Sequence, residues 1–257
     1  MILLNNERQQ QIVALLESKG EVQLQQLKEI FPDVSLMTLR RDLISLENSG
    51  YLIRTHGGAV STKKVALISQ DEDSYSIRAS ENVEAKMEIA RKALPLVEKG
   101  RSIYFDAGST IMYLAKILPD ENYTILTSGI NIALELVKRL KTSVVTLGGT
   151  VNRHTLSCSG PNALMALDSI NIDLAFMASS GFSLDSGFTV SNIYECELKK
   201  KIIKRAKKVI MLMDKSKINK DLAFTFANLE DVDIWVCNEL PPEDIRQEAL
   251  QNNLTII

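Results

Sequence analysis

The sequence predicts an α/β protein made of a small winged helix-turn-helix domain followed by a larger domain built around a parallel sheet. Three observations lead to this fold class. The chain has 257 residues, more than a typical domain of about 100–150 residues. Residues 1–60 contain three short helical patterns and then two extended segments around a glycine pair. From residue 80 onward, helical segments alternate with short apolar runs, and residues 61–79 between the two parts suit a linker or a short connecting helix.

The composition is that of a folded protein with a sizeable core. Hydrophobic residues make up 45% of the chain and charged residues 24%. No run of 18 apolar residues occurs, so we expect a soluble cytoplasmic protein with no membrane partner. The cysteines, Cys158, Cys196 and Cys237, are odd in number and form no C-x-x-C pattern, so we expect buried thiols. We also expect no metal and no cofactor.

The first two helices are expected near the N-terminus. The first begins close to Asn6 and ends at Gly20, a residue suited to a helix C-cap. Val22 fits a short strand. A second helix is expected over residues 24–31, and Pro32 ends it because proline lacks the N–H that a helix interior needs.

The third helix has a well-marked start. Ser35 is a good N-cap, and Val34 and Leu39 occupy the two positions of a hydrophobic staple. A rotation of about 100° per residue separates two faces of this helix. The expected apolar face consists of Leu36, Leu39, Leu43 and Leu46, and the expected polar face of Met37, Thr38, Arg41, Ser45 and Asn48. The polar face is the one expected to contact bases.

Positive charge is concentrated on this helix and on the segment after it. An arginine here can contact guanine or bind a phosphate. The adjacent pair Arg40 and Arg41 allows one base contact and one phosphate contact, but the sequence does not indicate which arginine makes which contact. The alternative is a solvated face whose arginines pair with Asp42. After Gly50, the segment YLIRTHGGAV predicts a wing. Residues 34–64 hold five arginines and lysines against two acidic residues, a local net charge of +3. The expected DNA contacts are Ser35, Met37, Thr38, Arg40, Arg41, Ser45, Arg54, His56, Gly57 and Gly58.

Six apolar runs in the second domain predict parallel strands and a Rossmann-like fold. They are SIYFD, YTILTS, SVVTLGG, DLAFMASS, KVIMLMD and DIWVC. Ligands of open α/β sheets bind at the carboxyl ends of the strands, where small residues let backbone N–H groups approach a phosphate. Five such tips carry small or polar residues: 106–110, 127–129, 148–150, 179–181 and 214–217. Any one tip is weak evidence, but five together favour a polar, phosphorylated ligand.

Two basic residues could neutralise that phosphate. Arg153 follows the Gly148-Gly149 turn, and Lys199 lies on the segment ECELKKKIIKRAKK. Because most lysines of such a helix are solvated, the interpretation of Lys199 as a ligand contact competes with a plain surface role.

The first domain closely resembles the N-terminal domain of the DeoR family of bacterial transcription regulators. The resemblance rests on the VSxxTLRRDL helix from Val34 to Leu43, on Gly50 and on the RxHGGA wing from Arg54 to Ala59. The second domain resembles the sensor domain of the same family, which is similar in fold to ribose-5-phosphate isomerase and glucosamine-6-phosphate deaminase. Its matching motifs are DAGST, LGGTVNRHTLSCSGP, DLAFMASSGF, GFTVSN, ECELKKKII and DKSK.

The resemblance implies a sequence-specific regulator, most simply a repressor of a sugar or sugar-alcohol operon. Its partners would be double-stranded operator DNA, a phosphorylated sugar effector and further copies of itself in a dimer or tetramer. At Ser128-Gly129 the chain departs from the Asn-Ser-type pair that relatives usually carry, which bears on which sugar is bound. The expected effector contacts are Asp106, Gly108, Ser109, Thr110, Thr127, Ser128, Gly148, Gly149, Arg153, Ser180, Gly181, Lys199 and Lys217.

Two other classes of protein remain as alternatives. The first is an isomerase-like or deaminase-like enzyme with a DNA-binding appendage, whose base would come from Asp106, Asp173, Glu195, Glu197 or Asp214. The chain has only two histidines and lacks G-x-S-x-G, G-x-G-x-x-G and P-loop motifs, so we assign no catalytic residue. The second is an architectural DNA binder whose large domain only oligomerises, for which polar strand tips have no evident use.

Overall fold

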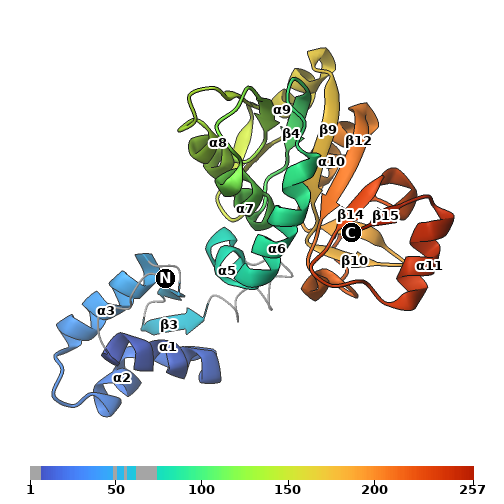
Figure 1. The fold of residues 1–257 in the computed structure, drawn as a ribbon. Helices are drawn as coiled ribbons and strands as arrows, with labels where there is room; N and C mark the ends of the chain where they lie inside the picture. The colour runs from blue at the N-terminus through green and yellow to red at the C-terminus, as the bar shows by residue number, and fades with distance from the viewer. Residues whose placement is uncertain (1–6, 49–50, 55–56, 62–73) are drawn as a thin grey trace. The chain divides into compact units, whose positions relative to one another are not determined.

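The computed structural model describes residues 7–48, 51–54, 57–61 and 74–257 (Figure 1). The chain divides into two compact units, one ending at Ile77 and the other running from Arg78 to Ile257. The division falls within the short helix α5 (Tyr75–Ser80), near the end of the stretch assigned to a linker. No helix in the described ranges is long and apolar enough to cross a membrane.

The first unit is a winged helix-turn-helix. Its elements, in order, are α1 (Glu7–Lys19), β1 (Glu21–Gln23), α2 (Leu24–Ile30), α3 (Leu36–Asn48), β2 (Leu52–Arg54) and β3 (Gly58–Ser61). Gly20 ends α1 with a φ of 76° and donates its N–H to Leu16 O at 2.8 Å. The strands pair antiparallel in the order β1-β3-β2. At Gly58 a Cβ atom would lie 2.0 Å from Val22 O, so glycine lets β3 approach β1.

The core of this unit is formed by the apolar stripes of its helices. Leu39, Leu43 and Leu46 of α3 are buried with Ile12 and Leu16 of α1 and Leu27 of α2. The prediction that Leu36 lies on the buried face is wrong, because 39% of it is exposed. Leu36 is the first residue of α3, and the buried stripe starts one turn later, at Leu39.

The second unit contains a seven-stranded sheet, and all six predicted apolar runs are strands of it. The strands are β4 (Ser102–Phe105), β5 (Thr124–Thr127), β6 (Ser143–Thr146), β9 (Ile172–Ala178), β12 (Ala206–Leu212), β14 (Ile234–Val236) and the unpredicted β15 (Thr255–Ile256). They lie in the order β15-β14-β12-β9-β4-β5-β6, and every neighbouring pair is parallel. The α/β fold class predicted from the sequence is therefore confirmed.

Helices cover both faces of this sheet and form two apolar layers (Figure 1). One face packs against α6 (Val83–Ala93), α7 (Ser109–Ile117) and α8 (Ile130–Leu136), and the other against α9 (Pro161–Ala166), α10 (Ile193–Arg205) and α11 (Glu243–Gln251). Within β4, Ile103 and Phe105 face the first layer whereas Tyr104 faces the second. This alternation is the period of two that a strand imposes on its side chains.

Smaller elements border the sheet. β7 (Thr150–Asn152) and β8 (Ser157–Ser159) form a hairpin, and β10 (Gly181–Ser183), β11 (Gly187–Val190) and β13 (Phe224–Ala227) form an antiparallel sheet. Four 3-10 turns complete the unit: η1 (Leu94–Leu96), η2 (Leu167–Ser169), η3 (Lys215–Lys217) and η4 (Leu229–Asp231).

The strand order places a topological switch point between β4 and β9. From β4 the chain adds β5 and β6 on one side, and later adds β9, β12, β14 and β15 on the other. The connections that leave β4 and β9 therefore run to opposite sides, and open α/β sheets bind their ligands at the carboxyl ends of two such strands. Asp106 directly follows β4, and Ser179 directly follows β9.

Candidate functional sites

The start of α3 is fixed by its N-cap. The Thr38 N–H donates to Ser35 Oγ at 3.1 Å, and the Ser35 and Thr38 hydroxyls are 3.0 Å apart. Val34 packs against the cluster that contains Leu39, as a hydrophobic staple requires. The Ser35 hydroxyl thus has a structural task in addition to its expected role at DNA.

The exposed face of α3 presents Met37, Arg40 and Arg41, and 60% of Met37 is exposed. The alternative that Asp42 pairs with these arginines does not fit the geometry. Asp42 is buried and accepts hydrogen bonds from Arg8 Nε at 2.6 Å and Gln9 Nε2 at 3.1 Å, both on α1. Arg40 and Arg41 make no ion pair with another described residue, so their charges are available to an anionic partner.

The wing carries a contact that the sequence reasoning missed. Arg54 of β2 donates from Nε to Glu47 Oε2 at 2.6 Å and from its backbone N–H to Oε1 at 3.0 Å. These two bonds lower the pKa of Glu47, the backbone bond being the larger cause. The positive charge of Arg54 is therefore less available to a DNA phosphate than that of Arg41. Gly57 is exposed and Gly58 is buried, whereas His56 lies outside the described residues.

A buried ion pair lies at the carboxyl ends of β4 and β9. The Lys199 ammonium, from α10, pairs with Asp106 Oδ2 and also donates to Ala178 O at 2.9 Å. The Asp106 carboxylate accepts two backbone N–H groups, from Ala107 at 2.9 Å and from Ala178 at 3.0 Å. Both charged residues are almost fully buried. The pair thus ties α10 to the ends of both strands at the switch point.

Tyr104 extends this network toward β5, although the sequence reasoning did not single it out. Its hydroxyl lies 2.8 Å from Ser128 Oγ and donates to Asp106 Oδ1 at 3.4 Å. Burial, and secondly the charge of Asp106, raise the pKa of Tyr104 well above its ordinary value. The neutral phenol is therefore the stable form. Thr127, also buried, orients the next turn by accepting the Gly129 N–H at 2.9 Å.

Glu195 adds a second buried carboxylate from α10. It accepts a hydrogen bond from Ser157 of β8, whose hydroxyl lies 2.8 Å from that of Thr155. Glu195 lies one helical turn before Lys199, so both side chains leave the same face of α10. In the sequence analysis Glu195 is a candidate only for the base of the isomerase-like or deaminase-like alternative. Its spacing of four residues from Lys199 is the signal that could have linked the two side chains.

Other expected effector residues follow the carboxyl ends of strands in the same sheet. Gly108 precedes α7 with a φ of 152°, and Ser109 and Thr110 form the buried first turn of that helix. Gly148 and Gly149 join β6 to β7, and at Gly149 a Cβ would lie 2.4 Å from Ser159 O. Ser180 donates its N–H to Thr189 O at 3.2 Å, and at Gly181 a Cβ would lie 2.3 Å from Lys220 O.

The three basic residues expected at the effector site differ in their exposure to solvent. Arg153 is exposed on the turn between β7 and β8, Lys217 is half-buried in η3, and Lys199 is buried in its ion pair. The structure therefore joins Asp106, Ser128 and Lys199 through hydrogen bonds, and it leaves Arg153 outside this network.

A further buried lysine, Lys86, went unnoticed in the sequence. Its ammonium donates to Glu81 O at 2.7 Å and to Arg78 O, which binds α6 to the last turn of α5 and to the residue after it. Asn82, the next residue, donates to Ser216 Oγ at 3.0 Å, beside the end of β12. Burial lowers the pKa of Lys86 to about 8, and the nearby charge of Asp214 opposes that shift.

The remaining carboxylates of the enzyme alternative are poorly placed for it. Asp173 lies near the start of β9, at the opposite edge of the sheet, where it binds the Ser102 N–H at 3.0 Å and Lys207 at 2.7 Å. Asp214 is buried and caps η3 through Ser216 N at 2.9 Å. Glu197 is exposed.

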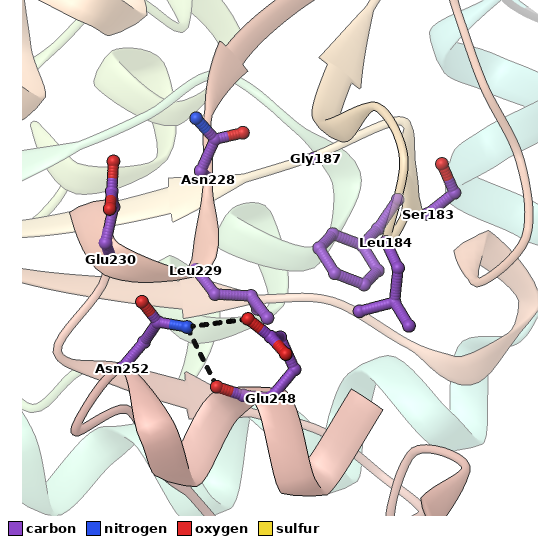
Figure 2. Close-up of a pocket in the computed structure, with 9 residues that line it drawn as sticks. Ser183, Leu184, Gly187, Asn228, Leu229, Glu230, Glu248 and Asn252 are labelled. Carbon is purple, nitrogen blue, oxygen red and sulfur yellow. Dashed lines mark hydrogen bonds between the residues drawn. The ribbon is translucent and has the colours of Figure 1, made fainter. Parts of the chain in front are cut away.

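A cavity of about 390 Å³ is lined by none of the predicted effector residues. Figure 2 shows its walls, which come from the β10–β11 turn, from η4 and from α11. Glu230 and Glu248 contribute carboxylates, and the Asn252 amide donates to Glu248 O at 2.9 Å. Two acidic side chains make this cavity unfavourable for a phosphate.

Comparison with known proteins agrees with this architecture. Residues 8–65 match the model of the DeoR-like helix-turn-helix domain, and residues 81–239 match that of the DeoR C terminal sensor domain. The chain therefore belongs to the DeoR family of transcriptional regulators, which confirms the resemblance seen in its motifs.

Several relatives align over most of their length. The HTH-type transcriptional regulator GolR of Listeria innocua is 35% identical, over 90% of this chain and 89% of its own. The HTH-type transcriptional regulator GlpR of Haloferax volcanii is 32% identical, over 99% and 98%. The L-fucose operon activator of Escherichia coli is 34% identical, over 90% and 94%.

Solved structures resemble the chain more distantly. Ribose 5-phosphate isomerase A of Methanocaldococcus jannaschii has a TM-score of 0.40 at 18% identity, over 55% of this chain and 57% of its own. The translation initiation factor eIF-2B of Pyrococcus horikoshii has a TM-score of 0.46 at 15% identity, over 94% and 92%.

Proposed function

We propose that this DeoR-family regulator represses a sugar or sugar-alcohol operon and leaves its operator when a phosphorylated sugar binds the second unit. The observation that carries the proposal is the buried polar network at the switch point. It connects Asp106, Lys199, Tyr104 and Ser128 at the strand ends where open α/β sheets bind ligands. Buried charges are costly, so their retention at this switch point favours a functional use over a purely structural one.

The DNA-binding half of the proposal rests on α3. Its exposed face holds Arg40 and Arg41, whose charges Asp42 does not neutralise, beside the exposed Met37. Such a helix can enter the major groove while the wing approaches the backbone. The other DNA contacts that we propose among the described residues are Ser35, Thr38, Ser45, Arg54, Gly57 and Gly58.

The sensor half of the proposal rests on two neighbouring features. The first turn of α7, at Ser109 and Thr110, offers backbone N–H groups and the positive end of a helix dipole to a phosphate. We propose that Arg153, which is exposed, and Lys217, which is half-buried, add positive charge that attracts the phosphate. The Asp106 network would read the sugar hydroxyls, because carboxylate and phenol groups can exchange hydrogen bonds with them.

Control of DNA binding requires two states of a homo-oligomer. We propose a dimer or tetramer, since paired recognition helices then meet two operator half-sites related by symmetry. An effector relieves repression only if it binds the DNA-free arrangement more tightly than the DNA-bound one.

Two arginine variants test the division of labour. Arg41→Ala should weaken operator binding by about ten-fold or more and leave effector binding unchanged. Arg153→Ala should weaken binding of a sugar phosphate and spare operator binding in the absence of effector. Arg101→Ala is the matched control, because Arg101 is an exposed arginine before β4, at the opposite edge of the sheet. Fluorescence anisotropy with DNA selected from a random pool, and calorimetry with the sugar phosphate, measure the two affinities. Equal loss of DNA binding in both variants would contradict the proposal.

An isomerase-like or deaminase-like enzyme is the second candidate, and one observation favours it. Asp106 pairs with Lys199, and the buried carboxylate of Glu195 belongs to the same helix one turn earlier, a set able to move a proton on a bound sugar. Incubation of the full chain with pentose and hexose phosphates distinguishes the two, because a sensor binds saturably and forms no product. Turnover that disappears in Glu195→Gln would favour the enzyme.

A further inference from the structure

Among the described residues, the uncharged strand β6 forms one edge of the large sheet. β6 is the last strand in the sheet order, and its residues Ser143-Val144-Val145-Thr146 contain neither a charge nor a proline. Edge strands of monomeric proteins normally carry such residues, which prevent pairing with another chain. At the opposite end of the sheet, β15 is only two residues long.

The backbone of β6 has hydrogen-bonding groups directed outward. Ser143 N donates to Tyr123 O at 2.9 Å, and Leu147 N donates to Thr127 O at 3.1 Å, so the odd-numbered residues of β6 bond to β5. In a parallel ladder the alternate residues then point the other way. The N–H and C=O groups of Val144 and Thr146 therefore face away from the sheet.

Apolar side chains flank this edge on both faces of the sheet. Val144 packs toward the layer that contains α8, so Val145 faces the other side, where 41% of it is exposed. On and just after α8, which packs against β6, Leu134 and Val137 are each 64% exposed and Leu140 is 94% exposed. Exposed apolar side chains beside an edge strand favour contact with another chain.

We propose that β6 is the contact through which two copies of this chain associate, by antiparallel pairing of their β6 strands. This proposal rests on the homo-oligomer of the proposed function and assigns the surface that forms it. With Val144 opposite Thr146 of the second copy, both outward-facing residues exchange backbone hydrogen bonds. Val145 then lies on the two-fold axis beside its own copy, and the two α8 helices lie on the same face of the joined sheet.

A second copy satisfies this edge better than an unrelated partner because the surface is complementary to itself. The pairing repeats each contact about the axis, as closed two-fold interfaces do. It covers the open hydrogen bonds, Val145 and the Leu134, Val137 and Leu140 side chains together.

Two substitutions in the full-length protein test this contact. Val145→Lys places two ammonium groups beside the axis, at a side chain that is already partly exposed. Thr146→Pro removes only an outward-facing N–H, so the ladder to β5 stays intact. Leu250→Lys is the matched control, because Leu250 is 77% exposed on α11, toward the other end of the sheet.

Sedimentation equilibrium measures the mass of each variant, and circular dichroism checks that each remains folded. We expect the wild type to contain at least two chains, and both β6 variants to raise the dissociation constant of the pair by more than about a hundred-fold. The Leu250→Lys control should keep the wild-type mass. Folded β6 variants that retain the wild-type mass would overturn this interface and leave the proposed oligomer standing. A wild-type mass of one chain would overturn both.

Discussion

The buried pair of Asp106 and Lys199 makes a quantitative prediction about stability. In Asp106→Asn, the Lys199 ammonium loses its negatively charged partner and keeps the Ala178 carbonyl, at 2.9 Å, and the face of the Phe226 ring. The new amide group also turns an N–H₂ toward a backbone N–H that the carboxylate had accepted, at Ala107 or at Ala178. Removing one partner of a buried pair costs about 3–5 kcal/mol, so the variant should lose about that much free energy of unfolding. This loss is a large share of the free energy of unfolding of a typical domain, which is about 5–15 kcal/mol.

A double variant separates the ion pair from its surroundings. Asp106→Asn with Lys199→Met removes both charges and keeps the length of the lysine side chain, so it should be less destabilised than the sum of its single variants by about 2 kcal/mol or more. Urea unfolding followed by circular dichroism measures all four proteins. A loss below about 1 kcal/mol in Asp106→Asn, or strictly additive losses in the double variant, would refute the reasoning.

The remaining predictions concern Lys86 and the two glycines after β6. Burial lowers the pKa of Lys86 from 10.5 to about 8. Between these values the unfolded chain binds a proton that the folded chain lacks, so stability gains a contribution as the pH rises from about 8 toward 10.5. We expect about 1–2 kcal/mol of this gain to be missing in Lys86→Met, as measured by urea unfolding at the two ends of the window; identical pH profiles would contradict it. Gly149→Ala should cost about 2 kcal/mol or more, because Gly149 has a φ of 144° and its Cβ would lie 2.4 Å from Ser159 O. Gly148→Ala is the control and should change stability by less than about 0.5 kcal/mol, since a Cβ there meets nothing within 4 Å; equal melting temperatures for the two variants would show that the turn tolerates both.

Local patterns of the sequence were sufficient for much of the fold. Short apolar runs marked six strands, and Ser35 with Val34 and Leu39 marked the start of α3, because these signals involve residues close together in the chain. The exposure of Leu36 was missed because the same periodic pattern continues past the point where α3 meets its neighbours.

The candidate site was predictable in its position and less so in its chemistry. Strand order brings Asp106 and Lys199 together although they are 93 residues apart in the chain, and no local pattern reveals such a pair. The Arg54–Glu47 bond and the burial of Lys86 also depend on packing between separate elements. The expected phosphate role of Lys199 stays a prediction, now for a lysine whose charge Asp106 already compensates.

The central claim is that a phosphorylated sugar controls DNA binding, and one titration tests it most directly. Full-length protein bound to fluorescent DNA selected from a random pool is titrated with a panel of pentose, hexose and sugar-alcohol phosphates, each beside its unphosphorylated parent. We predict that at least one phosphate lowers the DNA affinity by about ten-fold or more, a coupling of about 1.4 kcal/mol, while its parent sugar has no effect. A panel in which no phosphate changes the affinity, or in which the parent sugar acts equally well, would contradict the account.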